Sequence, residues 1–291
     1  MSSWRPILSD SLPRGRILFT SDKPLVTVVL RSGLGNRLFQ IFAALGYAER
    51  TGKQFVFYEK QFLENSHTGS KFTKEILMAF FPSVKFFRGV PPVWNHHYEA
   101  TDGFYDGTPI PDISGSVMLH GYFQNFVHFP LDFITKFRIP KPEICRINSM
   151  DFSNTYFIHV RLGDYEDSQY DVGLDYYYKS AIELCKPCKF LIFSDEPAKI
   201  NLAQFMLTED ICQIVPKEVS VWESLYLMSL CTGGICANST FSWFGAFSTK
   251  HKGKIYMPAV WIKNKVGNPV PAWARELPLA KATNLTLTPY S

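Results

Sequence analysis

The chain has 291 residues, of which 46% are hydrophobic and 19% are charged. This composition excludes a disordered or fibrous protein, and the length favours two domains of ordinary size. Lysine and arginine number 30 against 26 acidic residues, which leaves a net charge of +4. That charge is too small for a protein that tracks nucleic-acid backbones, so we expect no nucleic acid as a partner, but it allows a local site for a small anion.

The N-terminal segment and the cysteines bear on the location of the protein. Charged residues and prolines interrupt residues 1–20, which therefore lack the apolar stretch of a signal peptide. No run of about 18 apolar residues occurs, which predicts no integral membrane segment. The six cysteines are expected to be reduced thiols, and we expect a cytoplasmic protein.

The first half of the chain opens with a strand, a glycine loop, a helix and a second strand. Strands are predicted at residues 27–30 and 54–58, and an apolar helical pattern runs between them after Gly33 and Gly35. From residue 61 to residue 137 the pattern is poorer, which predicts loops and short elements.

Strands and helices alternate regularly in the second half. Helices are expected near Asp175, at Pro197, after the capping box Ser220-Val-Trp-Glu223 and near Thr240. Strands are expected at residues 156–160, 190–193, 211–215, 234–237 and 254–257. This alternation of apolar strands with helices predicts a parallel sheet with helices on both faces. Such a sheet binds its ligand at the carboxyl ends of the strands.

The domain boundaries follow from this pattern. Two prolines in the segment Ile139-Pro-Lys-Pro142 stop regular structure, so we place a boundary there. A first domain is expected over residues 22–140, a second over residues 150–265 and a C-terminal tail over residues 266–291. The fold class is α/β.

Polar residues follow the predicted strand at residues 156–160. The period of two puts His159 and Arg161 on one face of the strand, and Gly163 then turns the chain. A guanidinium at a strand end suits phosphate oxygens, because its planar fork donates two parallel hydrogen bonds. The alternative is structural: Arg161 pairs with Asp164, and His159 is a core histidine.

Asp195 follows the next predicted strand and has two interpretations. Its carboxylate could accept the N1–H and N2–H donors of a guanine base. Asp195 or Glu196 could instead cap the helix that is expected to begin at Pro197. The local sequence favours the cap.

A cluster of polar side chains follows the predicted strand at residues 234–237. Four hydroxyl or amide side chains stand at the start of the next helix, namely Asn238, Ser239, Thr240 and Ser242. Helix capping needs one such residue. Because hydroxyl groups, free N–H groups and the helix dipole together bind anions, the cluster predicts a diphosphate site.

The glycine loop allows a second type of nucleotide site. Gly33-x-Gly35 lies between a strand and a helix, and Glu59 follows the next strand, as in folds that bind NAD. Leu38, however, stands where the third glycine of that motif belongs, which argues against an NAD site. The loop is then interpreted as backbone that approaches a sugar or a phosphate.

Taken together, these motifs resemble those of the α-1,2-fucosyltransferases of glycosyltransferase family 11, from about Val28 to Trp261. Two positions depart from the family pattern: Leu162 stands where a second arginine is usual, and Arg37 replaces a common glutamine. The matching stretches are Gly33-Leu-Gly-Asn-Arg-Leu-Phe-Gln40, Gly121-Tyr-Phe-Gln124, His159-Val-Arg-Leu-Gly-Asp-Tyr165, Phe193-Ser-Asp-Glu196, Leu225-Tyr-Leu-Met-Ser-Leu230 and Ala237-Asn-Ser-Thr-Phe-Ser-Trp-Phe-Gly-Ala246.

The resemblance implies a GT-B-like enzyme with two Rossmann-like domains. It implies inverting transfer of L-fucose from GDP-fucose, the nucleotide-sugar donor, to the 2-hydroxyl of a galactose-type glycan acceptor. The donor is expected on the second domain. Family analogy assigns Arg161 to the diphosphate, Asp195 to guanine, and Ser239, Thr240 and Ser242 to the phosphates. His159 would help to orient the donor, and Asn238 is a further donor-binding candidate. Gly33, Gly35 and Asn36 would approach the donor from the first domain.

The chemistry is expected to need no metal, because no Asp-x-Asp pair occurs and Arg161 can stabilise the leaving diphosphate. No cofactor is expected besides the donor substrate. Arg161, Asp164 and Asn36 are the catalytic candidates, with Asn36 as an orienting residue, while the group that removes the acceptor proton stays open. The alternatives are transfer from another GDP-sugar, a nucleotide-dependent oxidoreductase and a non-catalytic carbohydrate-binding protein.

Overall fold

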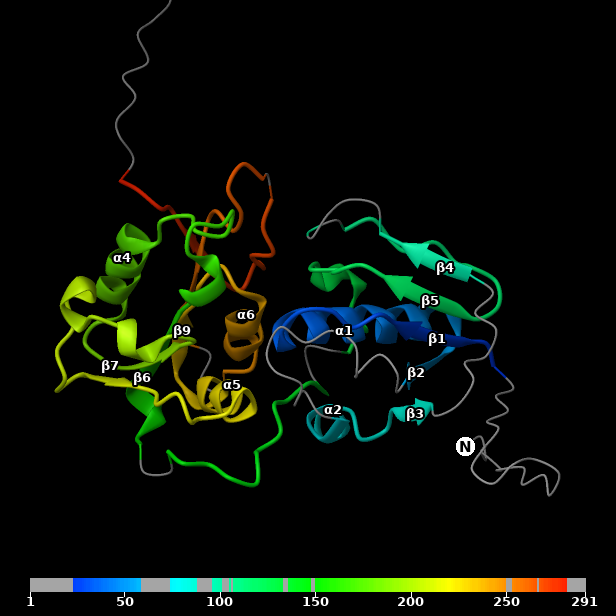
Figure 1. Cartoon of the computed structure of the whole chain (residues 1–291), viewed down its shortest axis with the longest axis horizontal. Helices are drawn as coiled ribbons and strands as arrows, with labels where there is room; N and C mark the ends of the chain where they lie inside the picture. The colour runs from blue at the N-terminus through cyan, green and yellow to red at the C-terminus, as the bar shows by residue number, and fades with distance from the viewer. Residues whose placement is uncertain are drawn as a thin grey trace, which may run out of the picture. The chain divides into compact units, whose positions relative to one another are not determined.

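The structure is a computed structural model in which the chain divides into two compact units, residues 1–140 and 141–291. We describe each unit by itself, with the elements labelled as in Figure 1. The division falls within the proline-containing segment at residues 139–142. The described residues are 23–58, 74–87, 96–100, 105, 107–132, 136–147, 150–249, 253–265 and 267–281.

The first unit contains a five-stranded parallel sheet in the order β3-β2-β1-β5-β4. The predicted strand–helix–strand start is confirmed, and so are the loops and short elements expected from residue 61 to residue 137, in the described part of that stretch. Its elements are β1 (Leu25–Val28), α1 (Leu34–Thr51), β2 (Gln54–Tyr58), α2 (Lys74–Phe80), β3 (Lys85–Phe87), β4 (His96–Glu99) and β5 (Val117–His120).

Helix α1 is the central packing element of the first unit, and most of its residues are buried. Gly46 lets the chain after β5 pack directly on this helix, since an added Cβ would collide with the backbone oxygen of His128. Phe42 then lies with its ring centroid 5.3 Å from that of Phe129. The helix ends at Gly52, whose φ of 67° is the left-handed conformation that glycine adopts without strain.

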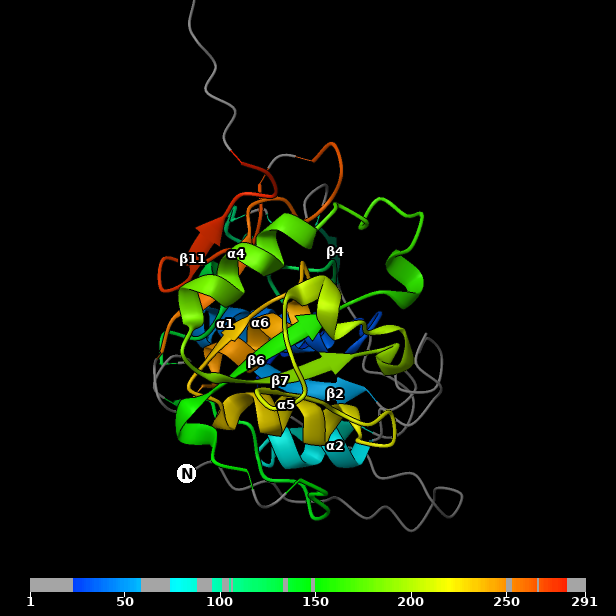
Figure 2. The same cartoon turned by 90° about the vertical axis from the view of Figure 1, so that its left-hand side faces the viewer.

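The second unit contains a six-stranded sheet in the order β11-β10-β9-β6-β7-β8, with every neighbouring pair parallel. Figure 2 shows α4 on one face of this sheet and α5 on the other, as the sequence predicts. Its elements are β6 (Thr155–Val160), α4 (Asp175–Cys185), β7 (Lys189–Ser194), β8 (Cys212–Ile214), α5 (Val221–Leu230), β9 (Gly233–Ile235), α6 (Thr240–Phe247), β10 (Ile255–Pro258) and β11 (Arg275–Leu277).

Apolar residues from both strands and helices build the core of the second unit. Ile158 of β6 and Ile192 of β7 share one buried cluster with Tyr177 and Ala181 of α4. The Tyr177 hydroxyl lies 2.8 Å from the backbone oxygens of Cys236 and Tyr256. The polar end of this core tyrosine is therefore satisfied by the neighbouring strands.

One sequence prediction for the second unit is wrong, and one strand was not expected. The helix expected at Pro197 is a single 3-10 turn, Pro197–Lys199, because Asn201 then caps a separate 3-10 turn, Leu202–Phe205. The expected C-terminal tail contains β11, whose residues pair with β10 in the register Tyr256 to Arg275. Backbone pairing on a sheet edge therefore makes a strand out of a segment with no apolar pattern.

Of the two hydrogen bonds of the capping box at the start of α5, the one to the Ser220 hydroxyl is present. Ser220 caps the helix, since its hydroxyl accepts a hydrogen bond of 3.1 Å from the backbone N–H of Glu223. The Glu223 carboxylate does not return to Ser220; it accepts hydrogen bonds from the backbone and the guanidinium of Arg146. Glu223 is fully buried, so this ion pair fastens the start of the second unit to α5.

Candidate functional site

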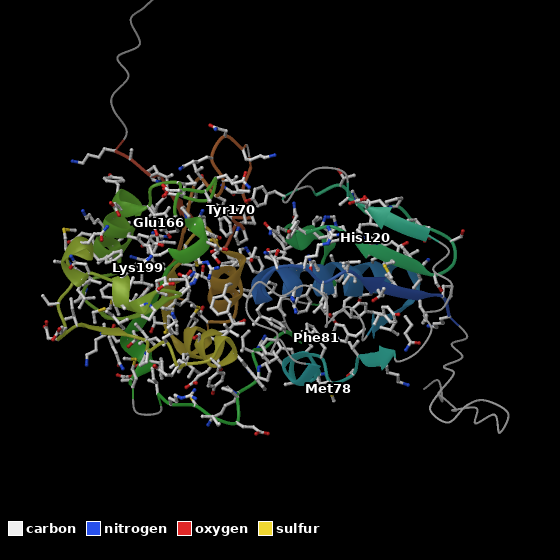
Figure 3. All side chains as sticks on the ribbon, in the orientation of Figure 1. Met78, Phe81, His120, Glu166, Tyr170 and Lys199 are labelled. Carbon is white, nitrogen blue, oxygen red and sulfur yellow. The ribbon has the colours of Figure 1, made fainter. Side chains whose placement is uncertain are left out.

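The loops after β6, β7 and β9 form one edge of the second unit. These three strands are neighbours in the order β9-β6-β7, and their parallel direction brings their carboxyl ends together. Arg161 follows β6, Asp195 follows β7, and the segment that starts α6 follows β9. An ion pair of 3.3 Å between Glu166 and Lys199 also joins the first two loops (Figure 3).

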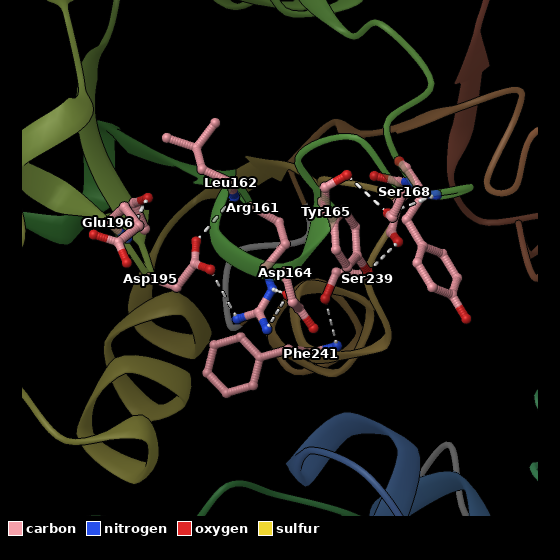
Figure 4. Close-up of polar contacts among 12 residues, drawn as sticks. Arg161, Leu162, Asp164, Tyr165, Ser168, Asp195, Glu196, Ser239 and Phe241 are labelled. Carbon is pink, nitrogen blue, oxygen red and sulfur yellow. Dashed lines mark hydrogen bonds and ion pairs between the residues drawn. The ribbon is translucent and has the colours of Figure 1, made fainter. Parts of the chain in front are cut away.

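The Arg161 guanidinium lies between two carboxylates, as Figure 4 shows. Its Nε and Nη2 lie 2.9 Å and 2.6 Å from the same Oδ1 of Asp164, and its Nη1 lies 3.3 Å from Oδ2 of Asp195. The Arg161 side chain is 28% exposed. The structural alternative, an Arg161–Asp164 pair, is therefore present, and it coexists with a partly accessible guanidinium at the sheet edge.

The Asp195 carboxylate does not cap the turn that begins at Pro197. Its Oδ1 accepts a hydrogen bond of 3.0 Å from the backbone N–H of Leu162, while Oδ2 pairs with Arg161. The backbone N–H of Glu196 donates to the hydroxyl of Ser194. The cap interpretation is wrong, because the carboxylate turns toward the loop after β6 rather than toward Pro197. Contact with guanine stays a prediction.

His159 belongs to the core of the second unit. It is 5% exposed, and its ring centroid lies 5.5 Å from that of Phe241. Burial, with a smaller effect from the Arg161 charge, lowers the pKa of His159 from 6.5 to about 3. The imidazole is therefore neutral at physiological pH, which agrees with a core histidine. A part of His159 in orienting the donor stays a prediction.

The polar residues at the start of α6 divide into two groups. Asn238 and Ser242 are buried and bond within the unit: the Asn238 amide donates to the backbone oxygens of Tyr170 and Trp261, and the Ser242 hydroxyl donates to Ser239. Contact of these two side chains with phosphate stays a prediction.

Ser239, which is also buried, and Thr240 form the second group, at the first turn of the helix. The Ser239 hydroxyl caps α6 by accepting a hydrogen bond of 3.3 Å from the backbone N–H of Phe241, and Thr240 is partly exposed. The first N–H groups of a helix have no partner within the helix, and the helix dipole favours an anion there. The α6 N-terminus and Arg161 thus place hydrogen-bond donors at the same edge.

Tyr165 is a site residue that the sequence reasoning missed. Its hydroxyl donates a hydrogen bond of 3.0 Å to the backbone oxygen of Asn238, and its ring stacks on Tyr170 at 5.1 Å. The centre of the Arg161 guanidinium lies 5.6 Å from the centroid of the Tyr165 ring. Tyr165 therefore fastens the loop after β6 to the start of α6 and supports Arg161. Its place directly after Asp164 in a motif was the available signal.

The first unit has a corresponding edge after β1 and β5. The Asn36 side-chain oxygen accepts a hydrogen bond of 2.6 Å from the Gln124 amide, and the hydroxyls of Ser32 and Tyr122 lie 3.2 Å apart. Two motifs far apart in the sequence therefore meet. Gly33 precedes α1 in an extended conformation, and an added Cβ there would contact no atom within 4 Å, so this start of the helix is open.

The remaining residues of the glycine loop bear on the NAD alternative. Gly35 is buried within α1. Leu38 is fully buried in the core, where the third glycine of an NAD motif would allow close packing of helix and strand. Glu59, the expected ribose-binding acid, lies outside the described residues.

The two departures from the family pattern also have distinct positions. Leu162 packs against the core cluster of the second unit. Arg37 is buried in the first unit, where its Nε donates a hydrogen bond of 2.9 Å to the Ser32 backbone oxygen. Leu162 therefore turns an apolar side chain inward at the position where a second cation is usual.

Across the described ranges, no group of three or more His, Cys, Asp or Glu side chains could hold a metal ion. No helix in the described part of the chain is long and apolar enough to cross a membrane.

Comparison with known proteins gives related sequences and similar folds. The family model for glycosyl transferase family 11 matches residues 94–266, more than half of the chain. An alpha-1,2-colitosyltransferase of Escherichia coli is 28% identical over 284 residues, which cover 83% of this chain and 93% of the relative.

Two solved structures are also similar. The fucosyltransferase NodZ from Bradyrhizobium has a TM-score of 0.46 at 16% identity, over 77% of this chain and 92% of that chain. A mutant of Arabidopsis thaliana FUT1 in complex with GDP has a TM-score of 0.43 at 14% identity, over 84% and 72% of the two chains.

Proposed function

The chain belongs to glycosyl transferase family 11, and from this premise we propose that it transfers L-fucose from GDP-fucose to the 2-hydroxyl of a galactose-type glycan. The relative from Escherichia coli supports an α-1,2 linkage, because its name describes transfer to that position. We propose that the second unit binds the nucleotide sugar and that the first unit contributes to acceptor binding.

The observation that carries this proposal is the position of Arg161 beside the N-terminus of α6. The guanidinium is held at the carboxyl edge of a parallel sheet, where such folds bind nucleotides. The Ser239 cap and the partly exposed Thr240 lie at the adjacent helix start. A diphosphate there would meet a cation, a hydroxyl and a helix dipole, which together favour multiple negative charges.

The same groups suggest how the transfer proceeds. When the bond between fucose and the β-phosphate breaks, negative charge grows on the leaving GDP, and Arg161 and the α6 N-terminus stabilise it. Attack by the acceptor hydroxyl from the opposite face inverts the anomeric carbon. Asp164 is the proposed acceptor of the hydroxyl proton, and Asn36 orients the acceptor sugar through the amide that Gln124 holds. Because Arg161 and the N–H groups at the start of α6 supply the stabilisation that a metal ion would otherwise give, activity is expected without a metal.

The alternative is that the donor is a GDP-sugar other than GDP-fucose. It is favoured by Leu162, which removes a cation from the usual pair, and by the different sugar in the name of the relative. The donor nucleotide would be unchanged, so the same Arg161 contacts apply. A nucleotide-dependent oxidoreductase is disfavoured by the buried Leu38.

The test is a transfer assay with a donor panel. GDP-fucose, GDP-mannose, UDP-galactose and NADH are each incubated with a galactose-terminated oligosaccharide, with and without EDTA, and the product is analysed by mass and by NMR. We expect fucosylated product from GDP-fucose, an α-1,2 linkage, and equal rates with EDTA. Transfer from UDP-galactose alone, or oxidation of NADH, would contradict the proposal, and a rate restored only by Mn²⁺ would contradict its metal independence.

A further inference from the structure

Arg161 is shared by two carboxylates that differ in burial and in their other contacts. The Asp164 side chain is 67% exposed, and a single one of its oxygens takes both Nε and Nη2 of the guanidinium. The Asp195 side chain is 21% exposed and binds Arg161 through Nη1 alone. The two acids therefore occupy different parts of the same cation.

Asp195 is fixed in place by contacts that do not involve Arg161. Its Oδ1 accepts the backbone N–H of Leu162 at 3.0 Å, and an added Cβ at Gly163 would collide with its Oδ2. The carboxylate is thus enclosed by the loop whose first residue it pairs with. Moving it would leave a partly buried N–H without a partner, so Asp195 stays where it is when the charge around Arg161 changes.

Asp164 has the opposite character. Nε and Nη2 form the two-donor edge of a guanidinium, which matches two oxygens of a phosphate or carboxylate. Asp164 fills that edge with one oxygen, from an exposed position where water competes for both charges. A diphosphate carries more negative charge and offers two oxygens to the same edge, so it outcompetes Asp164.

We propose that Asp195 positions the Arg161 guanidinium, whereas Asp164 occupies its two-donor edge until the diphosphate of the nucleotide sugar replaces it. This inference rests on the proposed function, since the displacing anion is the diphosphate of that donor. Displacement also frees the Asp164 carboxylate for another partner. Asp164 then weakens binding of the nucleotide, whereas Asp195 strengthens it.

The experiment compares three single variants with the full-length wild type by calorimetric titration of GDP and of inorganic pyrophosphate. Asp164→Asn removes the competing anion, so both ligands are expected to bind up to about fivefold more tightly. Glu166→Gln is the matched control: it removes the same charge from the same loop, but the ion pair of Glu166 is with Lys199. GDP affinity should change less than about twofold in that variant.

Asp195→Asn gives the contrasting result. GDP and pyrophosphate are both expected to bind at least about tenfold more weakly, because the guanidinium loses the acid that orients it. With saturating donor, kcat should fall as well. Loss of ground-state affinity alone would raise KM and leave kcat unchanged. A melting temperature measured for each variant identifies a protein that fails to fold.

Three outcomes would overturn the inference, and they are distinguishable. Equal or weaker GDP binding by Asp164→Asn relative to Glu166→Gln would show that Asp164 occupies no phosphate position. Loss of GDP affinity in Asp195→Asn with unchanged pyrophosphate affinity would assign Asp195 to guanine instead. Absence of GDP binding in the wild type and in every variant would overturn the proposed function together with the inference.

Discussion

The two units contain parallel sheets with similar loop edges, but the bonds that tie those loops differ in charge. In the second unit, Arg161 joins the loops after β6 and β7 through two carboxylates. In the first unit, the neutral pair Ser32–Tyr122 joins the loop after β1 to the loop after β5, and the neutral pair Asn36–Gln124 joins the start of α1 to the same loop. The charged edge suits an anionic nucleotide, and the neutral edge suits a neutral sugar.

The buried Arg37 of the first unit adds to the difference between the two edges. Arg37 follows Asn36 in the first unit, yet its side chain is turned inward to the backbone oxygen of Ser32, and burial lowers its pKa. The Arg37 guanidinium is therefore held inside the first unit, on the backbone of the loop after β1. In the second unit, by contrast, the Arg161 guanidinium is 28% exposed at the sheet edge.

Substitution of Arg161 is expected to have the largest effect. Arg161→Ala removes the cation that stabilises the leaving diphosphate, so kcat should fall by about a thousandfold and GDP affinity should fall as well. Steady-state kinetics with GDP-fucose measure both. Lys199→Ala is the matched control, since this cation lies on the same edge but pairs with Glu166. An alanine variant with near-normal turnover would remove the charged edge from the account.

Arg161→Lys tests the geometry of the charged edge. Lysine keeps the charge but loses the planar fork with which Arg161 contacts Asp164 and Asp195. We expect the lysine variant to remain strongly impaired in kcat. A turnover close to that of the wild type would show that only the charge matters.

Substitution of Glu223 tests whether the buried ion pair with Arg146, which lies away from the charged edge, affects stability and not nucleotide binding. Glu223→Ala leaves the Arg146 guanidinium and backbone N–H without their buried acceptor, which should cost about 3 kcal/mol of unfolding free energy. GDP affinity at a temperature where the variant is folded should be unchanged. Urea unfolding and titration with GDP measure the two quantities. Weaker GDP binding without loss of stability would extend the functional region to α5.

His159 predicts a pH dependence that separates the core from the edge. Its folded pKa of about 3 lies below the unfolded value of 6.5, so its contribution to stability is complete above pH 6.5. Below that pH the unfolded chain binds a proton that the folded chain does not. Stability should therefore fall by about 1.4 kcal/mol for each pH unit until pH approaches 3.

The measurement compares His159→Gln with the wild type by urea unfolding at several pH values. Other groups titrate in both proteins, so the difference between the two slopes isolates His159. A smaller acid dependence in the variant is expected. Identical slopes would mean that His159 is hydrated or charged in the folded protein.

The smallest effect is expected at the neutral edge. Asn36→Ala removes one hydrogen-bonding amide, so the KM for the acceptor should rise about fivefold, which corresponds to about 1 kcal/mol, with unchanged GDP affinity. Gln124→Ala should act similarly, and the double variant should add little because the two side chains form one contact. Asn125→Ala, which alters another amide of this unit, is the control. A change in GDP affinity would contradict the division between the edges.

The fold of the second unit could be predicted because its strands are continuous apolar runs. β6 and β7 are buried over most of their length, so composition alone identifies them. β3 has three residues, and β11 has the sequence Arg-Glu-Leu. Such short or charged segments carry no periodicity, and they become strands through pairing with β2 and β10.

The location of the charged edge was also predictable, whereas the direction of its side chains was not. Parallel strands bring Arg161 and Asp195 to one edge, which follows from the order of the elements. The sequence does not show that Ser242 bonds back to Ser239 or that Asn238 holds two loops. Contacts such as Tyr165 with Asn238 join residues 73 positions apart, and local patterns contain no information about them.

Hydrogen exchange measured by mass spectrometry with and without GDP tests the central claim most directly, because it locates the bound nucleotide. We predict that GDP slows exchange in peptides spanning residues 161–170 and 236–243 and leaves α5 unchanged. The Arg161→Ala variant should show no such protection at the same GDP concentration. Protection confined to the loop at Gly33, or protection of residues 161–170 that persists in the alanine variant, would contradict the assignment of the charged edge.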